Sequence, residues 1–159
     1  LRLLIKFFIS QANRGYLNGL ATEMGESTNS IRKELNHLYG AGYLVKIKND
    51  NKVEYKVNSS HPLYNNLREV VLKHLGLIDL VDSVLERMGD VDKIILIGDY
   101  ARGIDSGNIE IFLTGKSLNT DYISNLEKKI KKLIGRQASF YLTSNYKNSK
   151  YSIVLYSKD

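Results

Sequence analysis

The residues best suited to chemistry lie in one segment, residues 97–113, which reads IGDYARGIDSGNIEIFL. Its layout is typical of a catalytic loop: the end of a buried strand, a glycine turn, a short basic stretch and a second strand. Metal-dependent phosphoryl transfer would need two carboxylates separated by one residue, because oxygen ligands must neutralise and position hard cations about 3.5–4 Å apart. The sequence has Asn108, Ile109 and Glu110 at those positions. The segment therefore has the layout of a catalytic loop without the full set of carboxylates.

Strands and one helix are expected to position this segment. Residues 92–98 form a continuous apolar run, as in a strand buried on both faces, and residues 108–115 alternate as its neighbour. Two further strands are expected over residues 138–144 and 151–157. A helix over residues 120–136, between the second and third strands, is expected to turn four apolar residues inward and four lysines outward: Ile123, Leu126, Ile130 and Leu133, and Lys128, Lys129, Lys131 and Lys132. These elements predict a small α/β domain over residues 90–159 with about four strands.

This domain resembles the minimal nucleotidyltransferase domains of the DNA polymerase beta superfamily. In that family the first strand ends in Gly-Ser, an Ala-Arg-Gly follows, and an Asp-x-Asp pair holds Mg²⁺ while the loop meets the nucleotide phosphates. The matching residues are Gly98, Ala101, Arg102 and Gly103. The resemblance implies a nucleotide site formed by five residues: Gly98, Asp99, Arg102, Asn108 and Glu110.

The same site departs from the family where charge matters most. Asp99 replaces the serine, Asn108 replaces the first metal carboxylate, and Glu110 is longer than the second by one methylene. The strand expected to carry the third carboxylate has only Ser139, Tyr141 and Thr143 at the relevant positions. Asp99 also adds a negative charge where the resemblance would place a triphosphate. We therefore expect no catalytic residue, no bound metal and no cofactor, and a role for Arg102 either in binding an unidentified anionic ligand or in a surface salt bridge.

Residues 1–60 predict three short helices followed by a hairpin. The helices are expected over residues 1–10, 17–27 and 28–42, with a loop at residues 11–16. Gly25 is expected to end the second helix and Ser27 to cap the third. Val45, Ile47, Val53, Tyr55 and Val57 are expected to face inward from a hairpin that turns at residues 49–51.

This arrangement resembles the winged helix-turn-helix of ArsR-type and related bacterial transcriptional regulators, whose third helix enters the major groove. Small polar side chains at the start of such a helix reach base edges, while cations on the helix and the wing meet phosphates. The residues expected to contact DNA are Thr28, Asn29, Ser30, Arg32, Lys33, Asn36, Lys46, Lys48 and Lys52. The alternative is a solvated polar face, or a winged helix that binds protein. The arsenic-sensing branch uses cysteine ligands that this chain lacks, so metal sensing does not carry over.

The segment between the two domains, residues 61–89, predicts a helical connector. Pro62 suits a first helical turn, and Gly76 divides the following residues into two helices or kinks one. Two apolar stripes are expected: Leu63, Leu67, Val70 and Val71, and Leu77, Val81, Val84 and Met88. So much apolar surface needs a partner, which is either a second copy of the chain, giving a homodimer, or the adjacent domain.

Composition limits the remaining possibilities. The 159 residues carry a net charge of +6, with nine cationic against five acidic residues in residues 1–60, three against six in residues 61–92, and eleven against six in residues 93–159. The two basic ends favour a polyanionic partner. The absence of cysteine excludes disulfides and thiolate metal sites and favours a cytoplasmic location. No apolar run approaches the roughly 20 residues of a membrane span. Because the chain begins at Leu1 within an apolar segment, we expect a short leading segment before it.

These observations predict an α+β protein with a winged helix-turn-helix (residues 1–60), a helical connector (residues 61–89) and a degenerate nucleotidyltransferase-like domain (residues 90–159). The predicted function is that of a DNA-binding transcriptional regulator whose partner is double-stranded DNA. Its last domain would then serve for sensing, dimerisation or partner binding. The alternative is an active nucleotidyltransferase that the winged helix directs to its target. An Asp at position 108 and an acidic residue near position 141 would have favoured the enzyme.

Overall fold

The computed structural model describes residues 1–144, 146–147 and 149–159. Within these residues the protein is α+β, with seven α-helices and two small sheets, as the sequence predicted at this level. The chain divides into two compact units, Leu1–Val71 and Leu72–Asp159. The division falls inside the segment expected to be a connector, and the finer boundaries after residues 60 and 89 stay predictions.

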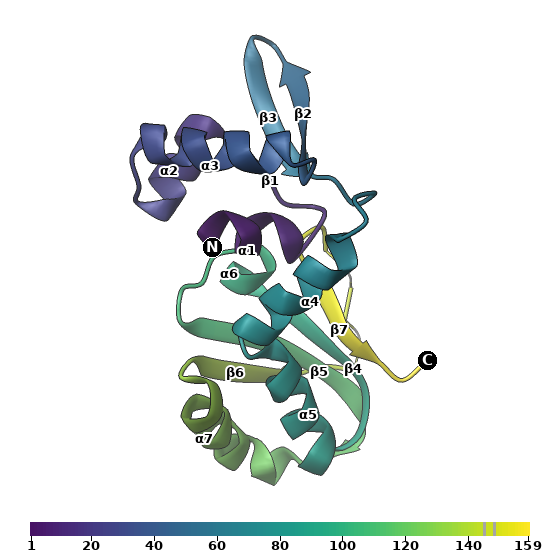
Figure 1. Ribbon diagram of the computed structural model, residues 1–159. Helices are drawn as coiled ribbons and strands as arrows, with labels where there is room; N and C mark the ends of the chain where they lie inside the picture. Colours follow the sequence, from purple (N-terminus) through teal and green to yellow (C-terminus); the bar gives the residue numbers. More distant parts are fainter. Residues whose placement is uncertain (145, 148) are drawn as a thin grey trace. The chain divides into compact units, whose positions relative to one another are not determined.

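The first unit contains three complete helices, a three-stranded antiparallel sheet of order β1–β3–β2 and most of a fourth helix, α4 (Tyr64–His74) (Figure 1). Its elements are, in chain order, α1 (Arg2–Phe8), β1 (Arg14–Tyr16), α2 (Leu17–Met24), α3 (Thr28–Gly40), β2 (Leu44–Asn49) and β3 (Lys52–Val57). The expected loop at residues 11–16 is wrong for its second half, because Gly15 pairs with Tyr55 of β3. A strand of three residues is too short to show a periodic pattern, so it can be recognised only from its pairing with β3.

Helix boundaries in this unit follow the capping signals. Gly25 ends α2 in the left-handed conformation, with φ of 65°. Ser27 caps α3 by accepting a hydrogen bond from the backbone N–H of Ser30 at 3.1 Å. The inward stripe of α3 is buried, since Ile31 is 0% and Leu35 1% exposed. The hairpin forms, with Asp50 and Asn51 at positive φ in the turn. The expected inward face is wrong, because Val45 and Ile47 pair with Lys56 and Glu54 and so lie on the opposite face from Val53, Tyr55 and Val57.

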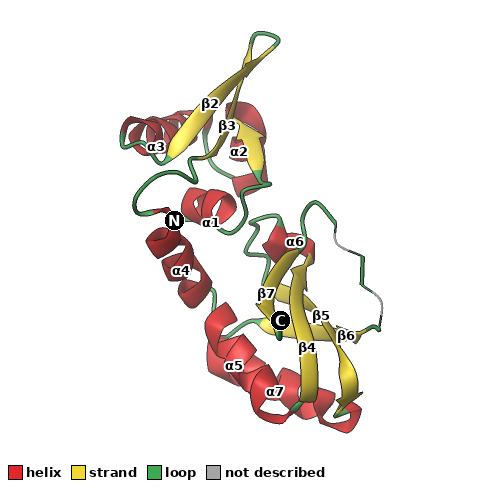
Figure 2. Cartoon of the chain, turned by 90° about the vertical axis from the view of Figure 1, so that its right-hand side faces the viewer, coloured by secondary structure: helices red, strands yellow, loops and turns green. Residues whose placement is uncertain are grey.

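The second unit is a four-stranded mixed sheet of order β6–β5–β4–β7, in which β5 and β6 are parallel and the other pairs are antiparallel. Its elements are the end of α4 (Tyr64–His74), α5 (Leu77–Arg87), β4 (Gly89–Ile97), α6 (Gly98–Ala101), β5 (Asn108–Leu118), the 3₁₀ turn η1 (Thr120–Tyr122), α7 (Ile123–Ile134), β6 (Gln137–Leu142) and β7 (Ile153–Ser157). Figure 2 shows α5 and α7 on one face of this sheet. The four strands expected from the sequence are therefore present.

Alternation along β5 separates the two faces of the sheet. Ile109, Ile111 and Leu113 are fully buried, whereas Asn108 is exposed and Glu110 is half-buried. The polar residues of β5 therefore share the face opposite to the buried isoleucines. This alternation brings Asn108 and Glu110, two of the five predicted nucleotide-site residues, to one face of the sheet.

Two of the predicted helix faces need correction. On α7, Leu126 and Ile130 are buried as expected, but Leu133 is 53% exposed and the Ile134 side chain packs against Gly76 instead. On α4, Val70 is 61% exposed although Val71 is 3% exposed. Leu63, expected in the same stripe, is 47% exposed. At Gly76 the chain adopts φ of 80°, so the connector consists of two helices.

Candidate functional site

The outward face of α3 gathers most of the residues predicted to contact DNA. All six predicted residues of this helix are exposed: Thr28, Asn29, Ser30, Arg32, Lys33 and Asn36. The buried Ile31 and Leu35 fix the rotation of the helix, so these side chains turn toward solvent. The result is a helix surface with small polar groups at its beginning and two cations one turn further on.

The hairpin adds three exposed lysines to the same unit. Lys46 lies over the ring of Tyr39 at the end of α3, with 4.0 Å between Nζ and the ring centroid. Lys52 lies 5.7 Å from the ring centroid of Tyr16. Lys48 is exposed near the tip of β2. The contact between Lys46 and Tyr39 holds the hairpin against α3, so the two groups of predicted residues belong to neighbouring elements.

The cations of α3 and of the hairpin are free of ion pairs. Within the part of the chain that the structure describes, none of Arg32, Lys33, Lys46, Lys48 and Lys52 lies in a salt bridge. Two other cations of the unit are paired: Lys6 with Glu23 at 2.9 Å, and Arg14 with Glu54 at 3.5 Å. Most of the exposed cations of this unit that lack an ion pair are thus the ones predicted to contact DNA.

In the second unit, the glycine turn lies beside Glu110. Gly98 begins α6 with φ of 72°, and a Cβ atom built on it would lie 2.1 Å from the Glu110 carboxylate oxygen Oε2. Only glycine fits there, because both the backbone conformation and the space exclude a side chain. Asp99 accepts a hydrogen bond from the Arg102 guanidinium at 2.6 Å. Of the two roles expected for Arg102, the structure therefore contains the surface salt bridge.

The two positions that would bind metal carry hydroxyl partners instead of acids. The hydroxyl of Tyr141 donates to Glu110 Oε1 at 3.3 Å, and the hydroxyl of Ser139 donates to Asn108 Oδ1 at 3.5 Å. Both hydroxyls come from β6, which runs parallel to β5 and pairs Ser139 with Glu110. Among the described residues, no group of three or more His, Cys, Asp or Glu side chains could hold a metal ion.

Sequence reasoning missed a hydrogen-bond network that joins the buried Tyr100 to Asp105 and Arg136 next to the glycine turn. The hydroxyl of Tyr100, whose side chain is 0% exposed, donates to Asp105 and accepts the backbone N–H of Gly107 at 2.9 Å. Arg136 donates to both Asp105 oxygens, at 3.0 and 2.8 Å, and to the backbone oxygen of Leu75 at 3.4 Å. The network fastens the loop between α6 and β5, which carries Asn108 at its end. No local pattern connects residues 31 positions apart, so only the fold could reveal it.

The pKa values of this network follow from its contacts. Burial, and then the hydrogen bond to Asp105, raise the pKa of Tyr100 to about 12. The hydrogen bonds from Arg136 hold the pKa of Asp105 below its ordinary value, against the opposing effect of burial. The hydrogen bonds between Arg136 and Asp105 also raise the pKa of Arg136. Tyr100 is therefore a neutral phenol and Asp105 a carboxylate at neutral pH.

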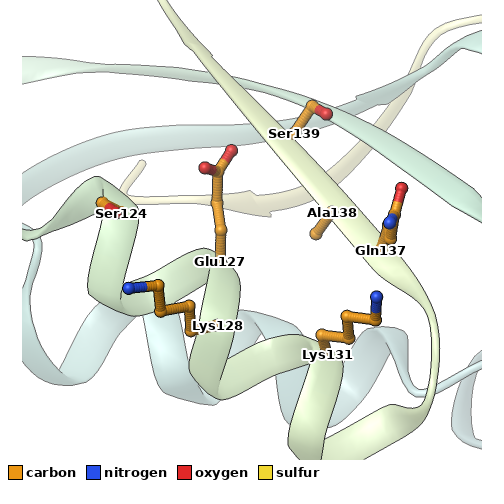
Figure 3. Close-up of a pocket in the computed structure, with 7 residues that line it drawn as sticks. All are labelled: Ser124, Glu127, Lys128, Lys131, Gln137, Ala138 and Ser139. Atoms are coloured by element: carbon orange, nitrogen blue, oxygen red, sulfur yellow. The ribbon is translucent and has the colours of Figure 1, made fainter.

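A second missed feature is a groove of about 310 Å³ between α7 and β6 (Figure 3). Ser124, Lys128 and Lys131 line it from the helix, and Gln137, Ala138 and Ser139 from the strand. Glu127 rises from α7 toward β6, and its Oε2 accepts the backbone N–H of Phe140 at 3.4 Å. The sequence predicted outward lysines on this helix but not the groove that they line.

Comparison with protein-family models finds no match to this sequence. Comparisons with the curated proteins and with the solved structures find no match either. No helix among the described residues is long and apolar enough to cross a bilayer.

Proposed function

We propose that the protein is a cytoplasmic, DNA-binding transcriptional regulator of the winged helix-turn-helix type. Helix α3 enters the major groove, and the lysines of the β2–β3 hairpin meet the backbone phosphates. The observation that supports this proposal best is the set of five exposed cations without ion pairs on α3 and the hairpin, beside an exposed polar surface at the start of α3. The order of three helices and a hairpin agrees with the resemblance noted in the sequence.

We further propose that the second unit is a nucleotidyltransferase-like domain that transfers no nucleotide and serves in regulation. The order of strand, glycine turn, short helix and strand supports the resemblance. Asn108 and Ser139 supply neutral oxygens where two divalent cations would need charge, and Asp99 holds Arg102 in an ion pair. The competing function is nucleotidyl transfer, and the observation in its favour is the single carboxylate of Glu110 beside Gly98.

A homodimer completes the proposal. Val70 on α4 and Leu63 just before this helix are exposed, and this apolar surface suits contact with a second copy. A two-fold dimer would match a pseudo-palindromic operator with half-sites about one helical turn apart. Sedimentation velocity tests this: Val70→Lys should give the monomer if α4 forms the contact, whereas a monomeric wild type would refute it.

DNA binding is tested on genomic fragments selected by the purified protein. In gel-shift titrations, Arg32→Ala with Lys33→Ala should abolish specific binding, since it removes both cations of α3. Lys48→Ala should weaken binding to all sequences and reduce the slope of log K against log salt by about 0.9. Arg14→Ala is the matched control, because this arginine already pairs with Glu54. Unchanged affinity in the double variant would remove α3 from the interface.

A further inference from the structure

The outer edge of β6 offers backbone hydrogen-bond donors and acceptors beside a lysine-lined helix. β6 is the last strand of its sheet. The N–H of Gln137 donates to Gly107 at 2.9 Å and that of Thr143 to Leu113 at 3.1 Å, so the odd-numbered residues face β5. The even-numbered residues, Ala138 and Phe140 among them, therefore direct their backbone groups to the free edge. A free edge of this kind accepts another strand.

Glu127 demonstrates that this edge takes a hydrogen-bond acceptor from outside the sheet. Its carboxylate accepts the N–H of Phe140 at 3.4 Å, which is long for a charge-assisted hydrogen bond. The position is the one that a carbonyl oxygen of an added strand would take. The Glu127 side chain thus covers the edge without pairing along it, and a strand would replace this one contact with several.

The positive charge of the lysines that line the groove favours an added strand with acidic side chains. Lys128 and Lys131 line the groove on either side of Glu127 (Figure 3). Neither lysine has an ion pair among the described residues, whereas Lys129 on the same helix pairs with Glu86 at 3.2 Å. The two groove lysines are about 4.5 Å apart along the helix axis, and side chains on one face of a strand repeat about every 6.8 Å. Acidic residues at alternate positions of an added strand would lie within reach of both.

We propose that an extended acidic segment of a partner protein binds as a fifth strand along β6, with its carboxylates toward Lys128 and Lys131. A second copy of this chain does not suit the same edge, because two-fold pairing of β6 with β6 would bring the lysines of both α7 helices together. The proposal deepens the partner-binding role proposed for the second unit. It is independent of DNA binding by the first unit, because it rests on contacts within the second unit alone.

The test uses a fluorescent, end-blocked peptide of about eight residues with alternating threonine and glutamate, added to the full chain. Fluorescence anisotropy should show saturable binding, with protection of the Phe140 amide from hydrogen exchange. Lys128→Ala with Lys131→Ala should weaken binding about tenfold. Lys132→Ala is the matched control on the same helix outside the groove, and it should change affinity less than about twofold. Glu127→Gln should strengthen binding, since it removes a negative charge from the groove.

A second variant tests the backbone contact separately. Ala138→Pro removes an outward N–H without removing a ladder hydrogen bond, so it should weaken peptide binding while the sheet is retained. The proposal is overturned if the peptide does not bind at about 1 mM, if Lys132→Ala costs as much as the groove variant, or if a threonine–lysine peptide binds equally well. Binding of oligo(dT) with the same variant pattern, and no protection of Phe140, would assign the lysines to nucleic acid instead. DNA binding measured on the same preparations separates these outcomes from failure of the regulator proposal.

Discussion

Replacing Tyr100 with phenylalanine should destabilise the second unit by removing one hydroxyl. The side chain is 0% exposed, and its oxygen both accepts the N–H of Gly107 and donates to Asp105. Phenylalanine retains the ring packing, so the change isolates the hydrogen bonds. Asp105 keeps two hydrogen bonds from Arg136, whereas Gly107 loses its acceptor. This hydrogen bond is part-buried, and a hydrogen bond contributes about 0.5–1.5 kcal/mol net, so we expect a loss of about 1 kcal/mol in the free energy of unfolding.

Urea denaturation followed by circular dichroism measures this loss, with Tyr141→Phe as the matched control. The Tyr141 hydroxyl also donates to a carboxylate, Glu110, but the side chain is 43% exposed and water can replace the contact. We expect the control to cost less than about 0.5 kcal/mol. Equal losses in the two variants, or no loss for Tyr100→Phe, would refute the claim that the hydrogen-bond network of Tyr100 holds the loop.

The pKa of Tyr100 adds a dependence on pH. Its value in the folded protein is raised to about 12, so the neutral phenol is the form that the fold stabilises. This contribution is fully present below the unfolded pKa of about 10 and is lost as pH rises toward 12. The difference between wild type and Tyr100→Phe should therefore be constant from neutral pH to about pH 10 and shrink above it. A difference that stays constant through alkaline pH would contradict this assignment.

Three further predictions concern the same unit. The Asp105 carboxylate has a lowered pKa, so its stabilisation should be present above about pH 4 and disappear as pH falls below it, and Asp105→Asn should lower the urea midpoint at pH 7 but not near pH 2. Gly98→Ala should cost roughly 1–3 kcal/mol because of positive φ and the close Glu110 carboxylate, while Gly19→Ala, with open space around it, should cost nothing. Mg²⁺ with any nucleoside triphosphate should leave the melting temperature unchanged and transfer no label; a metal-dependent shift of several degrees, with triphosphate consumption that Glu110→Gln stops, would favour the enzyme.

The sequence by itself determined the elements whose signals are local. The Ser27 cap, the Gly25 stop and the alternation around Asp50 predicted α3 and the hairpin, because hydrogen bonds within a few residues of the chain fix them. The buried strand at residues 92–98 was equally readable from its continuous apolar run. The exposed polar face of α3 follows from the same logic, since the buried Ile31 and Leu35 determine which residues remain outside.

Tertiary structure decided everything that depends on contacts between distant residues. The strand Arg14–Tyr16 exists because β3 pairs with it. Ile134, instead of the predicted Leu133, packs inward, because its side chain contacts Gly76. The ion pair of Arg102 with Asp99 was one of two roles expected for this arginine, and only the folded chain shows that this pair forms. The groove beside β6 and the link from Tyr100 through Asp105 to Arg136 had no signal in the sequence, because a hydrogen bond across 31 positions of chain leaves no periodicity to read. Caps and turns are determined by residues that are neighbours in the sequence. The free edge of a strand and the partners of a buried hydroxyl are determined only when the sheet has formed.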